Sequence, residues 1–254
     1  MPAGRTRLQK YSAPALEKGL EILEFLSQQD TGKALSQIAE GINRSGSEIF
    51  RMVIVLEESG YLSRTDADEY YLTEKMFQVG LRNPRLKRIW EVATPLMRLL
   101  SGKTNHCCYL SVANANSMIV VAKSESPIQF GVSAEIGHRH QLLNSASGTC
   151  LMAYMTIDSR ESLISSAEQS GIRVDRPITQ AMLEKCRTQS FVTLPSLVIA
   201  GIQDIAAPVL DPKSRQAVAA LTIPYFGLIG FQTSIDEIAS DLVSATKEIQ
   251  YALG

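Results

Sequence analysis

The sequence predicts an α+β protein of two domains. The chain has 254 residues, a length that suggests about two domains. Its apolar residues recur at helical spacing up to residue 102 and alternate as in strands from residue 106 onward. Hydrophobic residues make up 45% of the chain and charged residues 20%. This composition supplies enough apolar material for real cores and excludes disorder along the whole chain.

The charge balance limits the partners of the chain. The 25 Lys and Arg residues stand against 26 Asp and Glu, for a formal net charge of -1. An indiscriminate polyanion binder would carry a strong basic excess. A nucleic-acid site in this chain must therefore be a local surface of defined shape. No apolar run approaches the ~18–20 residues of a membrane span, and the first residues lack the apolar stretch of a secretory signal. We therefore expect a cytoplasmic protein without a membrane partner.

The first predicted domain is a winged helix-turn-helix. Residues 1–10 contain three basic side chains and no acid, as in a flexible basic arm. Three helical patterns and then a strand pair follow, and this order is that of a winged helix-turn-helix domain over residues 11–80. The expected elements are helices between residues 12 and 30, over 36–42 and over 45–58, and strands over 61–64 and 70–73.

Each of these helices has its own start or stop signal. Pro14 suits the first turn of the first helix. Ser36 is the expected N-cap of the second helix. In the third helix, Ser45 followed by Glu48 predicts a capping box, and Gly60 ends the helix.

The second predicted domain mixes strands with helices. A linker helix is expected over residues 81–102, around Trp90, and the α/β domain over 103–254. The expected strands are 106–113, 117–123, 129–133, 204–210 and 217–224, and the expected helices are 146–156, 158–170, 178–190 and 234–253.

Short segments in both domains are similar to those of one known family, in order and in spacing. These segments are residues 15–23, 50–51, 56–62 and 71–73, followed by 137–153, 201–208 and 219–221. The chain resembles the IclR family of bacterial transcriptional regulators over nearly its whole length. The resemblance implies a winged helix that binds operator DNA, a linker helix and a C-terminal PAS/GAF-like α/β effector-binding domain. It also implies a homodimer or a dimer of dimers that controls a catabolic operon, without enzyme activity or a cofactor.

The DNA contacts are expected around the third helix, because the N-terminal residues of a recognition helix contact base edges in the major groove. Ser47 can contact a base or a phosphate, and Arg51 suits a guanine or a phosphate unless it pairs with an acid such as Glu58. Glu48 either accepts from a cytosine amino group or only closes the capping box. The full candidate set is Ser36, Gln37, Arg44, Ser45, Ser47, Glu48, Arg51 and Arg64, with Arg5 and Arg7 of the arm as minor-groove candidates.

The effector site is expected at the turn Ser145-Ala-Ser-Gly148, where backbone donors and two hydroxyls precede a helix and suit a carboxylate. Ser147 would donate to the ligand, His140 would pair with it when protonated, and Asp204 would accept from a hydroxyl or amine. The alternatives are an N-cap for Ser147 and a strand-end ion pair for Asp204. The resemblance implies a carboxylic or aromatic acid as ligand. The pocket residues that it implies are Gln129, Val132, His140, Ala146, Ser147, Ile202, Asp204 and Thr222.

Two other kinds of site are weighed against this pocket. A metal site from the histidines and cysteines is disfavoured, since Cys107 and Cys108 would point to opposite faces of a strand. A cysteine-dependent enzyme would use Cys150 with His140, but apolar neighbours favour a buried Cys150, and no hydrolase, Walker or zincin motif occurs. The remaining alternative is a DNA-binding protein without an effector.

Overall fold

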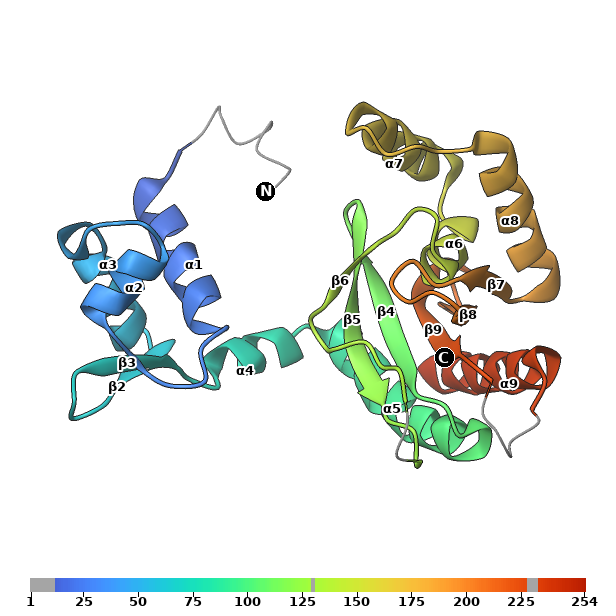
Figure 1. Ribbon diagram of the computed structural model, residues 1–254, viewed down its shortest axis with the longest axis horizontal. Helices are drawn as coiled ribbons and strands as arrows, with labels where there is room; N and C mark the ends of the chain where they lie inside the picture. The colour runs from blue at the N-terminus through green and yellow to red at the C-terminus, as the bar shows by residue number, and fades with distance from the viewer. Residues whose placement is uncertain (1–11, 129–130, 228–232) are drawn as a thin grey trace. The chain divides into compact units, whose positions relative to one another are not determined.

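The computed structural model describes residues 12–128, 131–227 and 233–254 (Figure 1). The predicted basic arm and Gln129 therefore lie outside the described residues. The chain forms two compact units, which divide between Leu86 and Lys87. Within the described residues, no helix has both the length and the apolar character needed to cross a membrane.

The first unit is a winged helix-turn-helix, as predicted. Its buried residues come from the three helices and the small sheet and include Ile22, Ile38, Ile49 and Val53. The strand order is β1-β3-β2, with all pairs antiparallel. The elements are α1 (Pro14–Leu26), β1 (Lys33–Ala34), α2 (Leu35–Gly41), α3 (Gly46–Glu58), β2 (Leu62–Arg64), β3 (Glu69–Leu72) and α4 (Lys75–Leu81).

The start of α2 differs from the prediction. Ser36 lies inside the helix, and the N-cap is Ala34, whose N–H donates to the Gln37 side chain at 2.9 Å. The reason is the short strand β1, because pairing of Lys33 and Ala34 with β3 holds the backbone extended until Ala34. Ser36 is therefore not the N-cap of α2.

The second unit is built on one six-stranded antiparallel sheet in the order β6-β5-β4-β9-β8-β7. Helix α5 (Pro84–Thr104) leads into this unit. The strands are β4 (Cys108–Asn114), β5 (Ser117–Ser124), β6 (Arg139–Gln141), β7 (Val192–Pro195), β8 (Gln203–Leu210) and β9 (Ala217–Tyr225). The helices are α6 (Ala146–Ala153), α7 (Ile157–Gln169), α8 (Arg176–Gln189) and α9 (Ile235–Leu253).

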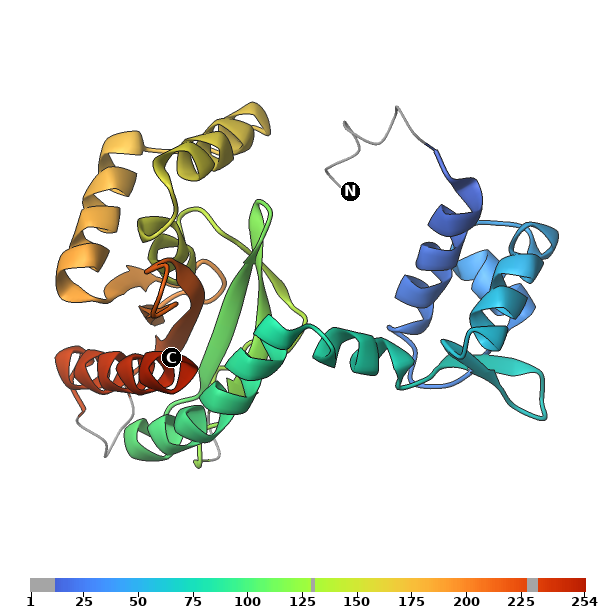
Figure 2. The ribbon, with the colours of Figure 1, turned by 180° about the vertical axis from the view of Figure 1, so that it is seen from behind.

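Helices cover both faces of this sheet. Figures 1 and 2 show α5 and α9 on one face, and α6 with α7 and α8 on the other. The alternation along β8 follows this division, because Ile205 and Ala207 lie in the core with α5 and α9, whereas Ala206 lies in the core with α6. The central strands are therefore buried on both sides.

The edges of the sheet differ from the prediction. Residues 131–133 form no strand, so the strand expected over 129–133 is wrong where the structure describes it. The strand at that edge is β6, which pairs with Ser117, Met118 and Ile119 of β5. The opposite edge strand, β7, was not predicted. It is four residues long and ends in Pro195, a residue that an edge strand tolerates.

Candidate functional site

An exposed face of α3 carries the candidate DNA-contacting side chains. Ser47, Phe50 and Arg51 are all exposed and lie at helical spacing on one face, while Ile49 and Val53 are buried on the other. Within the described part of the chain, Arg51 has no ion pair with an acid, so the pairing considered for it is not found. On this face the Ser47 hydroxyl is bonded to the Ser45 hydroxyl at 3.2 Å, whereas Arg51 can be presented to a groove without breaking an ion pair.

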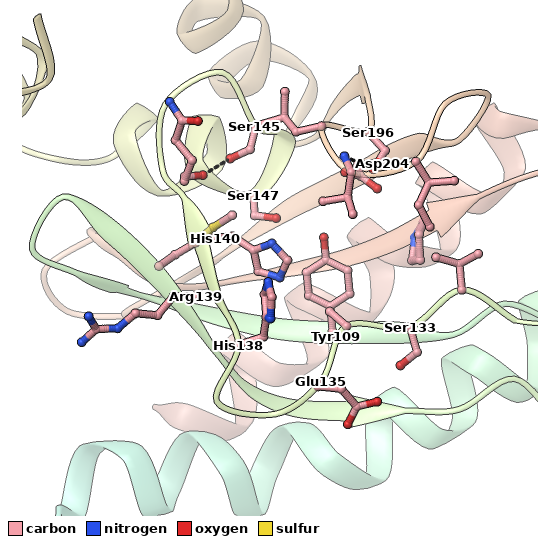
Figure 3. Close-up of a pocket in the computed structure, with 18 residues that line it drawn as sticks. Tyr109, Ser133, Glu135, His138, Arg139, His140, Ser145, Ser147, Ser196 and Asp204 are labelled. Atoms are coloured by element: carbon pink, nitrogen blue, oxygen red, sulfur yellow. Dashed lines mark hydrogen bonds between the residues drawn. The ribbon is translucent and has the colours of Figure 1, made fainter. Parts of the chain in front are cut away.

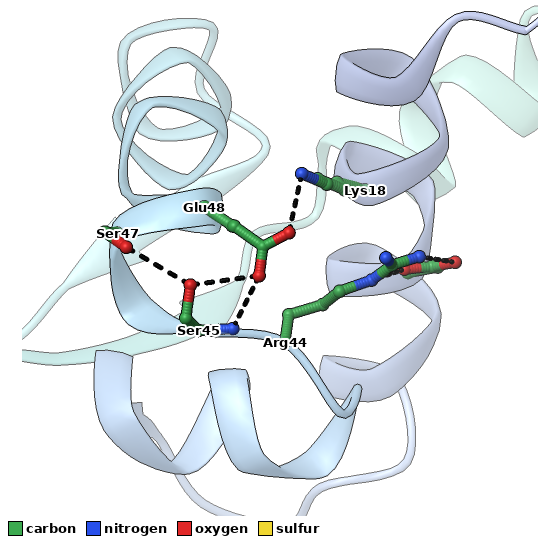
Figure 4. A network of polar contacts seen from close by, with 6 residues as sticks. Lys18, Arg44, Ser45, Ser47 and Glu48 are labelled. Carbon is green, nitrogen blue, oxygen red and sulfur yellow. Dashed lines mark hydrogen bonds and ion pairs between the residues drawn. The ribbon is translucent and has the colours of Figure 1, made fainter.

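Glu48 closes the capping box at the start of α3 (Figure 4). Its carboxylate accepts from the Ser45 N–H at 3.0 Å and from the Ser45 hydroxyl at 2.9 Å. It also pairs with Lys18 of α1 at 3.1 Å. These bonds, the backbone bond from Ser45 first, lower the pKa of Glu48 to about 2. Glu48 thus joins the start of α3 to α1, and its carboxylate is occupied.

The other candidate cations of this unit also have partners. Arg44 makes two bonds of 3.3 Å to the carboxylate of Glu21, which raise its pKa. Arg64 pairs with Asp68 at 2.7 Å and lies 5.6 Å from the ring centre of Tyr70. Both guanidinium groups are partly exposed, so each could contact a phosphate only by exchanging or sharing its acid. Ser36 and Gln37 are exposed at the start of α2.

A cavity of about 460 Å³ lies in the second unit (Figure 3). Its walls come from β4, β5, β6, β8, β9, the start of α6 and two connecting segments, residues 132–138 and 196–199. The volume is within the range of pockets for small molecules. The cavity lies at the α6 side of the sheet, as Tyr109, Ser147 and Asp204 show in the close-up.

The predicted pocket residues divide into two groups. The lining residues among them are Val132, His140, Ser147 and Asp204. Those outside the lining are Ala146, Ile202 and Thr222, all of which are buried. The second group therefore lies outside the cavity lining in this structure.

The hydroxyls at the start of α6 already have partners. The Ser145 hydroxyl accepts from the Gly148 N–H at 3.2 Å and donates to the Gln141 carbonyl at 2.9 Å. The Ser147 hydroxyl is bonded to the Thr222 hydroxyl at 2.9 Å, and both residues are buried. Ser145 is thus the N-cap, and Ser147 braces α6 against β9.

Asp204 is the acid at one end of the cavity. Burial raises the pKa of its carboxyl to about 6, although a bond from Ser196 acts in the opposite direction. The strand-end ion pair considered for Asp204 is not found among the described residues. A half-buried carboxyl without a cation favours a ligand group that donates to it.

Aromatic rings form the other end of the cavity. The His138 and His140 ring centres are 4.5 Å apart, and the His140 ring is stacked on Tyr109 at 6.0 Å. Burial first, and the nearby His138 second, lower the pKa of His140. The His140 Nε2 atom is buried and has no hydrogen-bond partner. Buried polar atoms normally have a partner, so this nitrogen is available to a group that enters the cavity.

The cysteines do not form a nucleophilic site. Cys150 is fully buried, and its sulfur lies 3.6 Å from that of Cys186 on α8. Burial raises the pKa of the Cys150 thiol, which is the reverse of what a nucleophile requires. No group of three or more His, Cys, Asp and Glu side chains in the described ranges is arranged to hold a metal ion.

Sequence reasoning missed several residues of these sites. Tyr109 lines the cavity, but a tyrosine in a buried strand has no distinguishing signal. The segment 196–199, with three apolar residues, also lines the cavity, and the sequence pattern does not indicate this. Phe50 is half-exposed on α3, and its spacing of three from Ser47 could have placed it on the same face.

This fold and this site define a DNA-binding protein with a small-molecule domain, and two family models match it. "IclR helix-turn-helix domain" matches residues 15–66, and "Bacterial transcriptional regulator IclR C-terminal" matches residues 85–251. The chain therefore belongs to the IclR family of ligand-responsive bacterial transcriptional regulators, as the sequence resemblance predicted.

Relatives and solved structures agree with this assignment. The chain is 26% identical to the HTH-type transcriptional repressor AllR of Salmonella typhi over 222 residues, 83% of this chain and 79% of that protein. It is 24% identical to the HTH-type transcriptional regulator KdgR of Escherichia coli K12 over 253 residues, 97% of this chain and 95% of that one. An IclR homolog from Microbacterium hydrocarbonoxydans, solved with 4-hydroxybenzoate, has the same fold, with a TM-score of 0.77, 20% identity, and coverage of 94% of this chain and 98% of that chain.

Proposed function

We propose that a small carboxylic or aromatic acid binds in the 460 Å³ cavity and changes operator binding by the winged helix, so that the protein controls a catabolic operon. The observation that carries this proposal is the cavity itself, with an acid that has no ion pair among the described residues and an unpartnered histidine nitrogen at its walls. The 4-hydroxybenzoate bound to a protein of the same fold supports the ligand class.

The proposed DNA surface is the exposed face of α3. Ser47 and Arg51 contact base edges in the major groove, and Phe50 packs on a thymine methyl group. Arg44, Arg64 and the start of α2 contact phosphates on either side. The protein acts in the cytoplasm as a homodimer or a dimer of dimers, which we expect light scattering of the purified protein to show. A monomer that still binds DNA tightly would contradict this part of the proposal.

The proposed coupling between the cavity and the DNA-binding unit runs through β4. Tyr109 of this strand lines the cavity, whereas its neighbours Cys108 and Leu110 lie in the core that α5 shares. The Cys108 thiol donates to the Met97 carbonyl of α5 at 3.4 Å. A ligand that moves Tyr109 therefore acts on α5, which leads to the DNA-binding unit. It shifts operator affinity only if it prefers one arrangement of the chain.

Operator selection followed by ligand screening tests this function. The purified protein selects duplexes from a random library, and the selected duplex is titrated in gel shifts with a panel of small carboxylic and aromatic acids. We expect at least one acid to change the affinity about fivefold or more, the usual lower limit for coupled sites. Tight, selective DNA binding that no acid changes, together with no ligand-induced thermal shift, would favour the effector-independent protein.

A further inference from the structure

The cavity has chemically different ends. Asp204 and Ser196 lie on one side of Tyr109, and His138 and His140 lie on the other (Figure 3). On the basis of the proposed function, we propose that the effector is an acid that also carries a hydroxyl or an amine and that it binds in one orientation. Its hydroxyl or amine donates to Asp204, and its carboxylate accepts from the histidine pair. This places the carboxylate away from the start of α6, where the sequence pattern had placed it.

The acidic end disfavours a carboxylate. The titratable groups that line the cavity are Tyr109, Glu135, His138, Arg139, His140 and Asp204. Arg139 is exposed and points away from the cavity in Figure 3, so it does not neutralise Asp204. A ligand carboxylate beside Asp204 would therefore put two like charges together at neutral pH.

The hydroxyls that would offset this repulsion are occupied. Ser147 is bonded to Thr222 at 2.9 Å, and the Ser145 hydroxyl is occupied by Gly148 and Gln141. A carboxylate that accepted from the Ser145 hydroxyl would displace the Gln141 carbonyl. One that accepted from the Ser147 hydroxyl would share it with Thr222. A hydroxyl or an amine has neither problem, because it donates to the Asp204 carboxylate in a charge-assisted bond.

The histidine end provides what a carboxylate needs. The His140 Nε2 atom is buried without a partner, and a buried polar atom left unpaired costs free energy. An imidazole N–H at this position donates to a carboxylate oxygen, and a bound carboxylate in turn favours the protonated ring. His138, with its ring centre 4.5 Å from that of His140, provides a second donor close by.

The middle of the cavity suits a flat or aliphatic body. The Tyr109 ring stacks on His140, and Met118, Val198 and Pro224 add apolar surface. A ligand that satisfies both ends must therefore carry its two polar groups on opposite sides of an apolar spacer. A para-substituted aromatic hydroxy acid has this arrangement, and so does a short chain with a hydroxyl far from its carboxylate.

Calorimetry with matched probes tests the orientation. At pH 8, where Asp204 is ionised, the full-length protein is titrated with 4-hydroxybenzoate, 4-aminobenzoate, benzoate, phenol, 6-hydroxyhexanoate and hexanoate. We expect each acid that carries a hydroxyl or amine to bind about tenfold or more tightly than the acid that lacks it, which is the lower range for a hydrogen bond to a charged group. Equal affinities within each pair would overturn the proposal.

Three variants test the contributions of the two ends of the cavity separately. Asp204→Asn should remove most of the advantage of the hydroxylated acids and leave benzoate and hexanoate unchanged or tighter. His140→Gln should weaken all the acids and leave phenol unchanged. Asp236→Asn, the same change in an exposed acid of α9, should leave every affinity unchanged.

The outcomes also separate this inference from the proposed function. If the acids bind and change DNA affinity, but Ser147→Ala weakens them while His140→Gln does not, the carboxylate lies at the start of α6. The orientation is then wrong and the proposed function stands. If none of the acids binds or changes DNA affinity, both are overturned.

Discussion

At the residue scale, Asp204 binds its proton more strongly in the folded protein than in the unfolded chain. Its pKa rises from the ordinary value of 3.8 to about 6 because burial disfavours the charged carboxylate. The folded state therefore holds more protons between these two values, and the stability linked to Asp204 decreases as the pH rises through 6. The charged Asp204 carboxylate therefore has a cost in folding stability above pH 6.

The first prediction concerns this cost. Asp204→Asn should raise the melting temperature at pH 8, where the native carboxyl is charged, and should have little effect at pH 4, where it is protonated. Thermal unfolding followed by circular dichroism at the two pH values measures the difference. A variant that is less stable at pH 8 would show that Asp204 has a stabilising partner, and the same shift at both pH values would show that its charge is not the cause.

The second prediction concerns Arg51, which is exposed on α3 and has no acid partner among the described residues. Arg51→Ala should weaken binding to the selected operator by ~1–3 kcal/mol if the guanidinium contacts a base, and should reduce discrimination at one position. Gel shifts against the operator and its single-base variants measure both effects. Unchanged affinity in a variant with unchanged melting temperature would refute the role.

At the element scale, the starts of α3 and α9 could be predicted because neighbouring residues set them, whereas the start of α2 could not. Ser45 with Glu48 and Ser234 with Glu237 form capping boxes three residues apart in the sequence. The short strands β1 and β6 could not be predicted in this way. Strand β1 has two residues and β6 has three, and only the partner strand decides where each pairs.

The difference between neighbouring and distant partners also explains which features of the site could be predicted. His140 and Asp204 line the cavity as the family resemblance implied, since a resemblance carries positions in a fold. The partner of Ser147 could not be predicted, because Thr222 lies 75 residues further along the chain. The hydroxyl assigned to a ligand therefore braces α6 in the structure.

The third prediction concerns Gly148 of α6. A Cβ atom there would lie 1.6 Å from the Leu142 carbonyl oxygen, which is backbone and cannot move aside cheaply. Gly148→Ala should therefore unfold or strongly destabilise the second unit. In Gly102→Ala the new Cβ on α5 meets nothing within 4 Å, so this control should be neutral or stabilising, by up to about 1 kcal/mol. Similar unfolding curves for the two variants would contradict this account of α6 packing.

At the whole-molecule scale, the winged helix and the α/β unit are confirmed as an IclR-family architecture with a near-neutral chain. Among the described residues, two of the cations proposed to contact DNA, Arg44 and Arg64, already pair with acids. We therefore expect electrostatic attraction alone to give weak DNA binding.

The fourth prediction follows from this charge balance. Non-specific duplexes should bind weakly at physiological salt, and the affinity for the selected operator should fall with salt by a slope that reflects only a few phosphate contacts. Gel shifts over a range of salt concentrations measure this slope. A steep slope with equal affinity for all duplexes would indicate a general DNA binder.

Because helices cover both faces of the sheet, the amides on the two sides of the cavity should exchange with solvent at different rates. Tyr109 and Asp204 belong to central strands whose amides should exchange with solvent slowly, because exchange there requires opening of the whole unit. The facing segments, residues 131–137 and 196–199, have no regular ladder and are largely exposed, so they should exchange quickly. A ligand in the proposed site would therefore contact slowly exchanging strands on one side and quickly exchanging segments on the other. Hydrogen–deuterium exchange should report its arrival as protection of the two segments, with the central strands unchanged.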